Sequence, residues 1–332
     1  MSVAKKTSII KLLPKIGKSS WNLFRETWLE FMDKNAFDKG AALAYYTIFA
    51  LPPIIIIIIS IIGSLFSREA VTGQIYQEIK GLIGHEGALE VQKMVENVSQ
   101  SNELTFATVF GVITLLLTAT GMFISMQNSL NAIWGVKPKP RREYLKMATD
   151  RLISFAMILS ISFLLLVSLV VHAIVAKIGG YLTRIIGEAA IIFIQTFNNV
   201  FSLAVVTLLF AAIFKFLPDA KIRWRDVWVG SIVTALLFTL GKFLIGLYLG
   251  NSNLATVYGA AGTVVVILTW VFYSSQILFF GSIFTLNYSR KYGSNIYPSV
   301  YAVRVIVEEV EAGKTAINKE PSKFATPEPP EE

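Results

Sequence analysis

The 332-residue sequence contains no cysteine and only two histidines, His85 and His172. Without cysteine there is no disulfide framework, thiol nucleophile or thiolate metal site. Two histidines so far apart cannot supply the converging ligands that a metal-dependent nuclease needs. A phosphate-binding glycine loop followed by Lys and Ser or Thr is also missing, which argues against direct use of ATP. The sequence therefore predicts a protein that is not an enzyme and that binds no cofactor or metal.

Charged residues are scarce as well. They make up 16% of the chain, whereas 54% is hydrophobic, and soluble domains run nearer to a quarter charged. The apolar residues are gathered into six blocks, each long enough for the ~20 residues that a membrane-spanning helix needs. The predicted spans are at about residues 43–63, 105–128, 152–176, 191–215, 227–249 and 263–286. The predicted fold class is all-α, a polytopic membrane bundle of six transmembrane helices.

The distribution of positive charge predicts the orientation of this bundle. Of the 30 lysines and arginines, 24 fall in segments that six spans place on the side of the N-terminus, and five fall on the other side. An excess of lysine and arginine marks cytoplasmic loops. Both termini are therefore predicted to be cytoplasmic, in the inner membrane of a bacterium. This bias accounts for the formal net charge of +8, so no nucleic-acid partner is predicted.

The segment that precedes the first span contains an amphipathic helix. Within residues 1–39, which are basic and predicted to be cytoplasmic, Trp21, Phe24 and Trp28 recur at helical spacing with charged residues elsewhere around the helix. A helix of this kind lies in the membrane interface. The alternative is that it packs on the cytoplasmic ends of the bundle, and the sequence is compatible with both.

The remaining segments complete the predicted domain organisation. Residues 40–289 form the six-span membrane domain, with residues 67–103 as an outer helical loop that caps the bundle. Residues 290–332 form a cytoplasmic tail. In it the spacing of Val300, Val303 and Val310 predicts a short helix, and disorder is expected from about residue 314.

The candidate substrate pathway begins in the first span. Pro52 and Pro53 follow Tyr45 and Tyr46 there, and adjacent prolines remove backbone donors, so the helix is predicted to break at this pair. Discontinuous helices often line transport sites. The alternative is a purely structural kink held by packing.

Polar residues in and near other spans extend the candidate pathway. Lys242 is a charge inside the fifth span; it either contacts an anionic substrate or headgroup, or extends its amine outward to water. Asn128 and Asn131 lie at the end of the second span, where they line a pathway or join helices. Tyr258 lies in the short loop before the sixth span, and with Pro52 and Lys242 it is expected to surround a cavity.

Several short motifs, in order along residues 20–290, resemble the YihY/BrkB family of inner-membrane proteins, members of which were once labelled ribonuclease BN. The motifs are Ala41–Thr47 leading into Pro52, Ser129–Trp134, Phe216–Pro218, Arg223–Asp226 with Gly230, Leu240–Lys242 through Tyr248, Tyr258-Gly259, Trp270 and Gly281. The resemblance implies six spans with both termini inside, and a transport role linked in some members to lipid. Gly281 is followed by Ser282 rather than by the acidic residue common in the family, so proton coupling is not carried over.

Residues and resemblance together predict a transporter or flippase-like protein for an amphiphilic or anionic substrate, with membrane lipids as partners. The alternative is a membrane scaffold that binds partners without transport. Ribonuclease activity is not expected, because the chain lacks metal ligands for it. The substrate and the oligomeric state are left open.

Overall fold

A computed structural model of the chain describes it in four main stretches. These are residues 21–63, 121–139, 188–251 and 262–305, together with residues 89 and 92 and scattered helical positions between 152 and 177. Residues 1–20, nearly all of the predicted outer loop 67–103 and the tail from about residue 314 lie outside the described residues. The predictions for those segments stay predictions.

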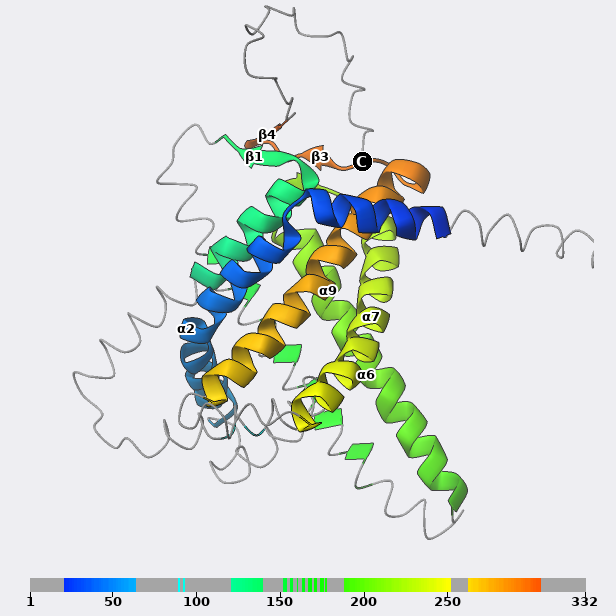
Figure 1. Ribbon diagram of the computed structural model, residues 1–332. Coiled ribbons are helices and arrows are strands. Elements are labelled where there is room, and N and C mark those ends of the chain that lie inside the picture. The colour runs from blue at the N-terminus through cyan, green and yellow to red at the C-terminus, as the bar shows by residue number, and fades with distance from the viewer. Residues whose placement is uncertain are drawn as a thin grey trace, which may run out of the picture.

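Long helices make up most of the described fold (Figure 1). They are a helix over residues 21–33, α2 at Ala36–Gly63, a helix over residues 121–134, α6 at Glu188–Phe216, α7 at Trp224–Asn251 and α9 at Gly262–Tyr292. The first two are separated by a short turn in which Asn35 has a positive φ of 50°. α7 packs against both α6 and α9, and α2 packs against α9.

Three of the described helices are long and apolar enough to cross a membrane. The stretches are Ala190–Phe216, Trp224–Tyr248 and Val264–Tyr292. They coincide with the predicted spans at 191–215, 227–249 and 263–286, so helices of spanning length are confirmed at these positions. The other three spans stay predictions.

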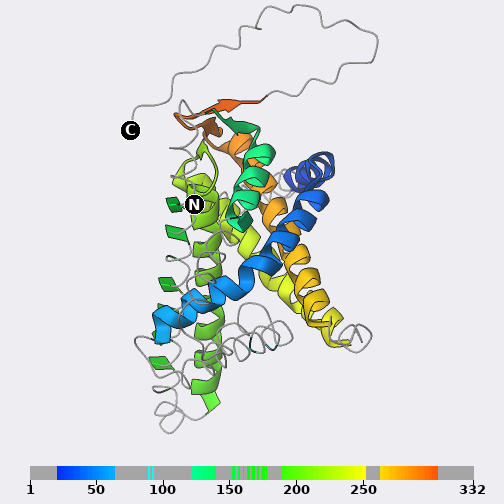
Figure 2. The same ribbon diagram turned by 90° about the vertical axis from the view of Figure 1, so that its left-hand side faces the viewer.

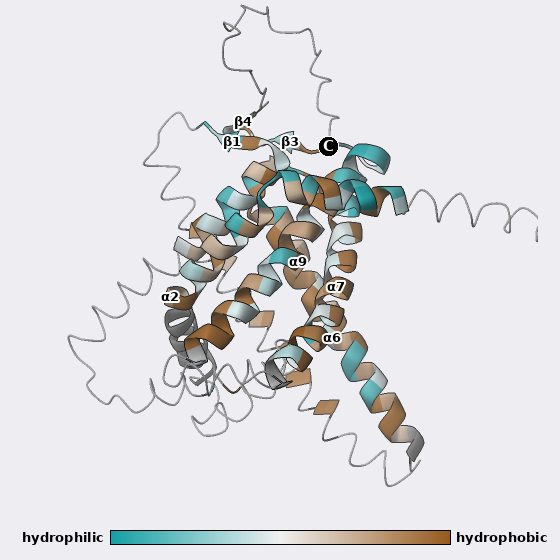
Figure 3. Cartoon of the chain, in the orientation of Figure 1, coloured by the Kyte–Doolittle hydropathy of each residue, from teal (hydrophilic) through white to brown (hydrophobic). Residues whose placement is uncertain are grey.

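The outer surface of these helices is apolar. On α7 large hydrophobic side chains are exposed at a regular spacing of four residues; they are Trp224, Trp228, Ile232, Leu236, Leu240 and Leu244. A helix in water exposes polar residues instead. Hydrophilic residues gather at one end of the helices, and hydrophobic residues cover much of their length (Figure 3). This distribution matches a surface that faces lipid.

α2 passes through Pro52 and Pro53 as one helix of 28 residues. The predicted break of the first span at this pair is therefore wrong. The helix axis instead changes direction part-way along its length (Figure 2). A proline inside a helix commonly produces such a kink, and membrane helices tolerate it because neighbouring groups can satisfy the freed carbonyls.

Four short strands lie together at one end of the helices, which we name the strand end. The pairs are β1 (Val136–Pro138) with β4 (Ala302–Arg304), and β2 (Ala220–Lys221) with β3 (Tyr297–Pro298), both antiparallel. The predicted all-α class is therefore incomplete, although the described chain is mostly helical.

Strand β4 lies where the valine spacing predicted a helix, so that prediction is wrong for residues 302–304. The later part of the predicted helix, with Val310, lies outside the described residues. The backbone next to β1 supplies the reason. The N–H of Val305 donates to the carbonyl of Gly135 at 2.8 Å, and that of Lys139 donates to the carbonyl of Tyr301 at 2.7 Å. A distant segment thus satisfies backbone groups that a local helix would have satisfied by itself.

The helices α7 and α9 approach each other closely where they cross. Gly230 faces Thr285, and Gly281 faces Thr234, so closely that a Cβ at either glycine would overlap the threonine side chain. Each threonine is fully buried and donates to the carbonyl of the glycine on its own helix, at 2.7 Å. The two helices therefore meet through reciprocal glycine–threonine contacts, a small-residue packing common between membrane helices.

The helix over residues 21–33 packs on the strand end of the bundle. Phe24 and Phe31 contact Phe280 of α9, with ring centroids 5.0 and 5.9 Å apart. Glu30 pairs with Arg290 at 3.2 Å. Packing on one end of the bundle, the alternative drawn from the sequence, is therefore observed, and the cytoplasmic location of that end stays a prediction. The interfacial position stays a prediction, and it is consistent with Trp21, which is 69% exposed.

Candidate functional site

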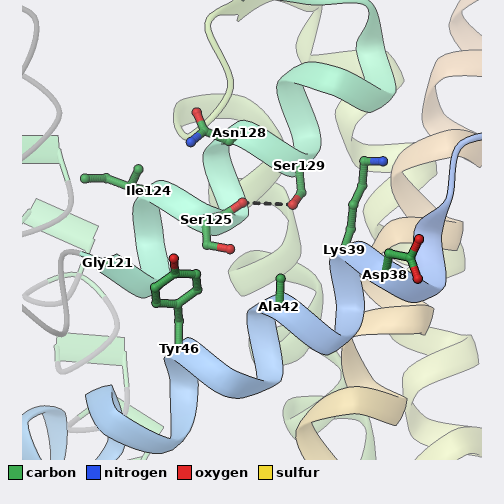
Figure 4. Close-up of a pocket in the computed structure, with 9 residues that line it drawn as sticks. All are labelled: Asp38, Lys39, Ala42, Tyr46, Gly121, Ile124, Ser125, Asn128 and Ser129. Atoms are coloured by element: carbon green, nitrogen blue, oxygen red, sulfur yellow. Dashed lines mark hydrogen bonds between the residues drawn. The ribbon is translucent and has the colours of Figure 1, made fainter.

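A groove of about 520 Å³ lies between α2 and the helix over residues 121–134 (Figure 4). One wall comes from α2 and the other from the second helix. The lining residues are Asp38, Lys39, Ala42, Tyr46, Gly121, Ile124, Ser125, Asn128 and Ser129. On each wall they recur at intervals of about three or four residues, so each helix lines the groove with one face.

Hydroxyl and amide groups occupy the middle of the groove. The hydroxyls of Tyr46 and Ser125 lie in the space between the helices, and Asn128 lies about one turn further along the helix over residues 121–134 (Figure 4). The Ser129 hydroxyl donates to the Ser125 carbonyl at 2.8 Å, so its donor is engaged within its own helix. Tyr46 and Asn128 are both exposed. The groove therefore offers hydrogen-bond donors and acceptors to a polar group that enters it.

Lys34, in the turn that precedes α2, links this part of the chain to the helix over residues 121–134 at the strand end. Lys34 donates to the carbonyl of Ile133 and pairs with Glu30 at 3.0 Å. Lys39 donates to the carbonyl of Lys34. Burial lowers the pKa of Lys34 below its usual value, although the nearby Glu30 carboxylate acts in the opposite direction. The helices that form the groove are thus fastened at one end.

Asn131 lies close to the groove in sequence but serves another purpose. Its side-chain amide donates to Oδ2 of Asp219 at 2.8 Å, and its carbonyl oxygen accepts from the Asp219 backbone N–H at 2.8 Å. Gln127 donates to the same carboxylate at 3.2 Å. Asn131 is 3% exposed. These contacts form a clamp between the helix over residues 121–134 and the turn that joins α6 to α7.

The comparison with protein families covers both the groove and the clamp. The family described as Virulence factor BrkB matches residues 27–299. The chain belongs to the BrkB family. This match confirms the resemblance noted in the sequence. It also confirms that the chain is a membrane protein. No solved structure matches this chain.

Three curated relatives of this BrkB-family chain are described as UPF0761 membrane proteins. One from Saccharophagus degradans is 29% identical over 91% of this chain and 67% of its own length. One from Pseudomonas aeruginosa strain LESB58 is 28% identical over 78% of this chain and 61% of its own length. One from Rhodospirillum centenum is 28% identical over 82% of this chain and 59% of its own length. The matches thus span about two thirds or less of the relatives.

The structure brings together two of the predicted pathway residues of this BrkB-family protein, Tyr46 and Asn128, on opposite walls of the groove. Tyr45 is exposed beside them, with its ring 5.8 Å from that of Tyr46. Lys242 is half-buried on α7 and does not line the groove. Its role stays a prediction.

Two further predictions about the pathway lie partly or wholly outside the described residues. Pro52 and Pro53 are in the described backbone of α2, but their side chains lie outside the described residues. Tyr258 is also outside them. The predicted cavity around Pro52, Lys242 and Tyr258 is therefore untested.

Asp38, Lys39 and Ser125 are among the groove residues that the sequence did not single out. The signal for the first two was weak, because charged residues just before an apolar run also occur at the water-exposed start of any membrane helix. For Ser125 a signal existed. It lies three residues before Asn128, on the same helical face, so the amide pattern could have been extended backward.

Proposed function

We propose that this BrkB-family protein is a transport protein of the flippase type, and that the polar head of an amphiphilic or anionic substrate passes along the groove between α2 and the helix over residues 121–134. The observation that carries the proposal is the groove itself. Its volume of about 520 Å³ falls within the range of sites that hold small molecules, ~300–1,000 Å³.

The distribution of polarity in the groove supports an amphiphilic substrate. Tyr46, Ser125 and Asn128 provide neutral hydrogen-bonding groups, while Ala42 and Ile124 provide apolar wall. A polar group in hydrocarbon costs several kcal/mol when it has no partner. A groove with such groups lowers this cost for a headgroup, while an acyl chain can stay in the surrounding lipid.

Charge at one end of the groove bears on the class of headgroup. Asp38 and Lys39 contribute one carboxylate and one ammonium group to the lining. The Lys39 amine is engaged by the Lys34 carbonyl but retains further donors. An anionic group, or a headgroup that carries both charges, can therefore be bound at this end.

The alternative function, a scaffold without transport, is favoured by a different observation. The helix over residues 21–33 exposes Trp21, Trp28 and Leu29 next to the bundle, which is a surface suited to a membrane interface or a partner. A scaffold has no need of the groove. The two functions therefore predict different results when the groove is blocked. A transporter should lose substrate movement, whereas a scaffold should show no such change.

The test uses the purified full-length chain in vesicles that contain a fluorescent phospholipid with a labelled headgroup. Movement of the lipid between leaflets is followed by chemical bleaching of the outer label. Ala42→Trp fills the groove, whereas Ala41→Trp places the same ring on a neighbouring exposed position that does not line it. We expect movement to fall to the protein-free rate with Ala42→Trp and to persist with Ala41→Trp.

Two outcomes would contradict the proposal. If both tryptophan variants move lipid as the unmodified chain does, the groove is not the pathway. If the unmodified chain moves neither anionic nor zwitterionic labelled lipid faster than empty vesicles, flippase activity toward phospholipids is excluded and the scaffold function is favoured.

A further inference from the structure

A second surface, on the outside of the bundle and distinct from the groove, has the pattern of a lipid-binding site. It lies where α6 turns into α7 at the strand end. It consists of an aromatic row, Phe216, Trp224 and Trp228, with the basic residues Lys215, Lys221, Arg223 and Arg225 around the turn. We refer to it as the turn patch.

The aromatic row of the turn patch is exposed and ordered by ring contacts. The rings of Phe216 and Trp224 meet edge to face with centroids 5.9 Å apart, and those of Trp224 and Trp228 are 6.4 Å apart. Between 39 and 54% of each side chain is exposed. Tryptophans with one polar edge are favoured at the level of lipid headgroups.

The basic residues lie next to this row. The Lys215 ammonium is held over the Trp224 ring, 5.4 Å from its centroid, and donates to the carbonyl of Ile222 at 2.6 Å. Lys221, Arg223 and Arg225 are exposed. Among the described residues, no carboxylate forms an ion pair with any of these three.

The acidic residues of the same segment are bonded to groups within the protein. Between residues 215 and 228 the chain has two carboxylates, Asp219 and Asp226. Asp219 is engaged by the clamp from Asn131. Asp226 is 2% exposed and accepts from Ser289 and from the backbone and side chain of Ser294 at 3.2–3.3 Å. The surface of the turn therefore carries positive charge that its own acids do not neutralise.

An apolar stripe continues from the turn patch along the outside of α7. After Trp224 and Trp228, it contains Ile232, Leu236 and Leu240, and 39–57% of each side chain is exposed. Sixteen residues of helix cover ~24 Å at 1.5 Å per residue, which is comparable to the depth of one leaflet. Positive charge, an aromatic row and an apolar stripe thus follow one another in the order of a phospholipid's own parts.

We infer that the turn patch binds an anionic phospholipid, with its phosphate beside Arg223 and Arg225, its glycerol region at Trp224 and Trp228, and an acyl chain along the stripe. Basic clusters at the end of a membrane helix attract anionic headgroups, and arginine matches phosphate geometry especially well. The site needs no transport activity, so it stands independently of the function proposed for the groove.

The experiment measures fluorescence quenching of the full-length chain in vesicles by brominated phosphatidylglycerol or brominated phosphatidylcholine at equal mole fraction. We expect stronger quenching by the anionic lipid. Arg223→Gln with Arg225→Gln should abolish that preference. Lys137→Gln with Lys139→Gln removes the same charge from exposed positions at β1 and should retain it. Trp224→Phe with Trp228→Phe should remove most of the difference between the two lipids.

Circular dichroism and size-exclusion elution establish first that each variant is folded. The inference is overturned if the arginine variant keeps the preference for the anionic lipid. It is also overturned if the arginine and the lysine variants lose the preference for the anionic lipid equally. The overall charge of the chain, and not the turn patch, would then determine that preference. Full preference in the Trp224 and Trp228 variant would place the bound lipid elsewhere and would likewise overturn it.

Discussion

The α7–α9 crossing and the α2 groove both use small residues between helices, yet one is closed and the other is open. At the crossing, glycine faces threonine, whose hydroxyl is satisfied by its own helix, so the backbones approach fully. At the groove, Gly121 faces the ring of Tyr46. A Cβ atom added to Gly121 would lie 3.6 Å from Cδ1 of that ring. The tyrosine holds the helices apart. A small residue brings helices together only when the opposite side chain is short as well.

The largest effect is expected when a side chain is forced into the closed region. Gly281→Leu must displace Thr234 and separate α7 from α9, so it should destabilise the fold by at least ~1–3 kcal/mol, the usual range for overpacking. Gly121→Leu enters the groove instead and should leave the melting temperature nearly unchanged while slowing lipid movement. Thermal unfolding in detergent measures both. Equal destabilisation by the two variants would show that the regions do not differ.

The next effect separates two asparagines of one helix. Asn131→Ala removes a side-chain donor that lies 2.8 Å from the Asp219 carboxylate, which should cost ~1–3 kcal/mol. Asn128→Ala, on the groove side, should cost less than about 0.5 kcal/mol, as for most surface changes, but should slow lipid movement. Denaturation midpoints together with the vesicle assay test this pair. A more stable Asn131 variant would contradict the clamp.

A smaller effect is expected from Lys242, which lies on α7 outside the groove lining. A charge within a membrane helix is costly, so Lys242→Leu should hold or raise the melting temperature. Lys242→Gln serves as the polar control. The vesicle assay then decides between its two sequence-based roles. Unchanged lipid movement indicates a lysine that extends to water, whereas loss of movement in both variants indicates contact with the substrate.

The smallest effect concerns the pH dependence of stability at Lys34, which bonds to Ile133 at the end of the groove. Because burial lowers the pKa of Lys34 in the folded chain, the unfolded chain binds more protons between that pKa and the ordinary lysine value. This lysine therefore adds stability as pH rises through that interval. The melting temperature of the unmodified chain minus that of Lys34→Met should increase as pH rises toward the ordinary pKa of lysine. If this difference in melting temperature stays constant or falls over that range, the pKa of Lys34 is not lowered in the folded chain.

Composition and periodicity were enough to predict the long apolar helices. The stretches Ala190–Phe216, Trp224–Tyr248 and Val264–Tyr292 were predictable because twenty apolar residues have few alternatives to a spanning helix. The α2 kink was over-interpreted as a break, since the sequence shows the missing proline donors but not the neighbours that compensate for them.

The clamp and the strands could not be predicted from local pattern, because their partners are distant. Asn131 and Asp219 are 88 residues apart, and β4 pairs with β1 from the other half of the chain. One signal was available and missed. Gly230 and Gly281 each begin the same pattern, Gly-Ser-Ile-x-Thr, and the two copies pack against each other. A comparison of the chain with itself would have suggested this crossing.

The partners of the two carboxylates at the α6–α7 turn are made at different times during synthesis. Asp219 finds Asn131 already synthesised, 88 residues earlier. Asp226 must wait for Ser289 and Ser294, which follow it by 63 and 68 residues. At ~5–20 residues per second, that interval lasts several seconds on the ribosome. During that interval Asp226, at the start of α7, lacks its native partners. The junction between α7 and α9 can therefore be completed only after α9 and Ser294 have been made.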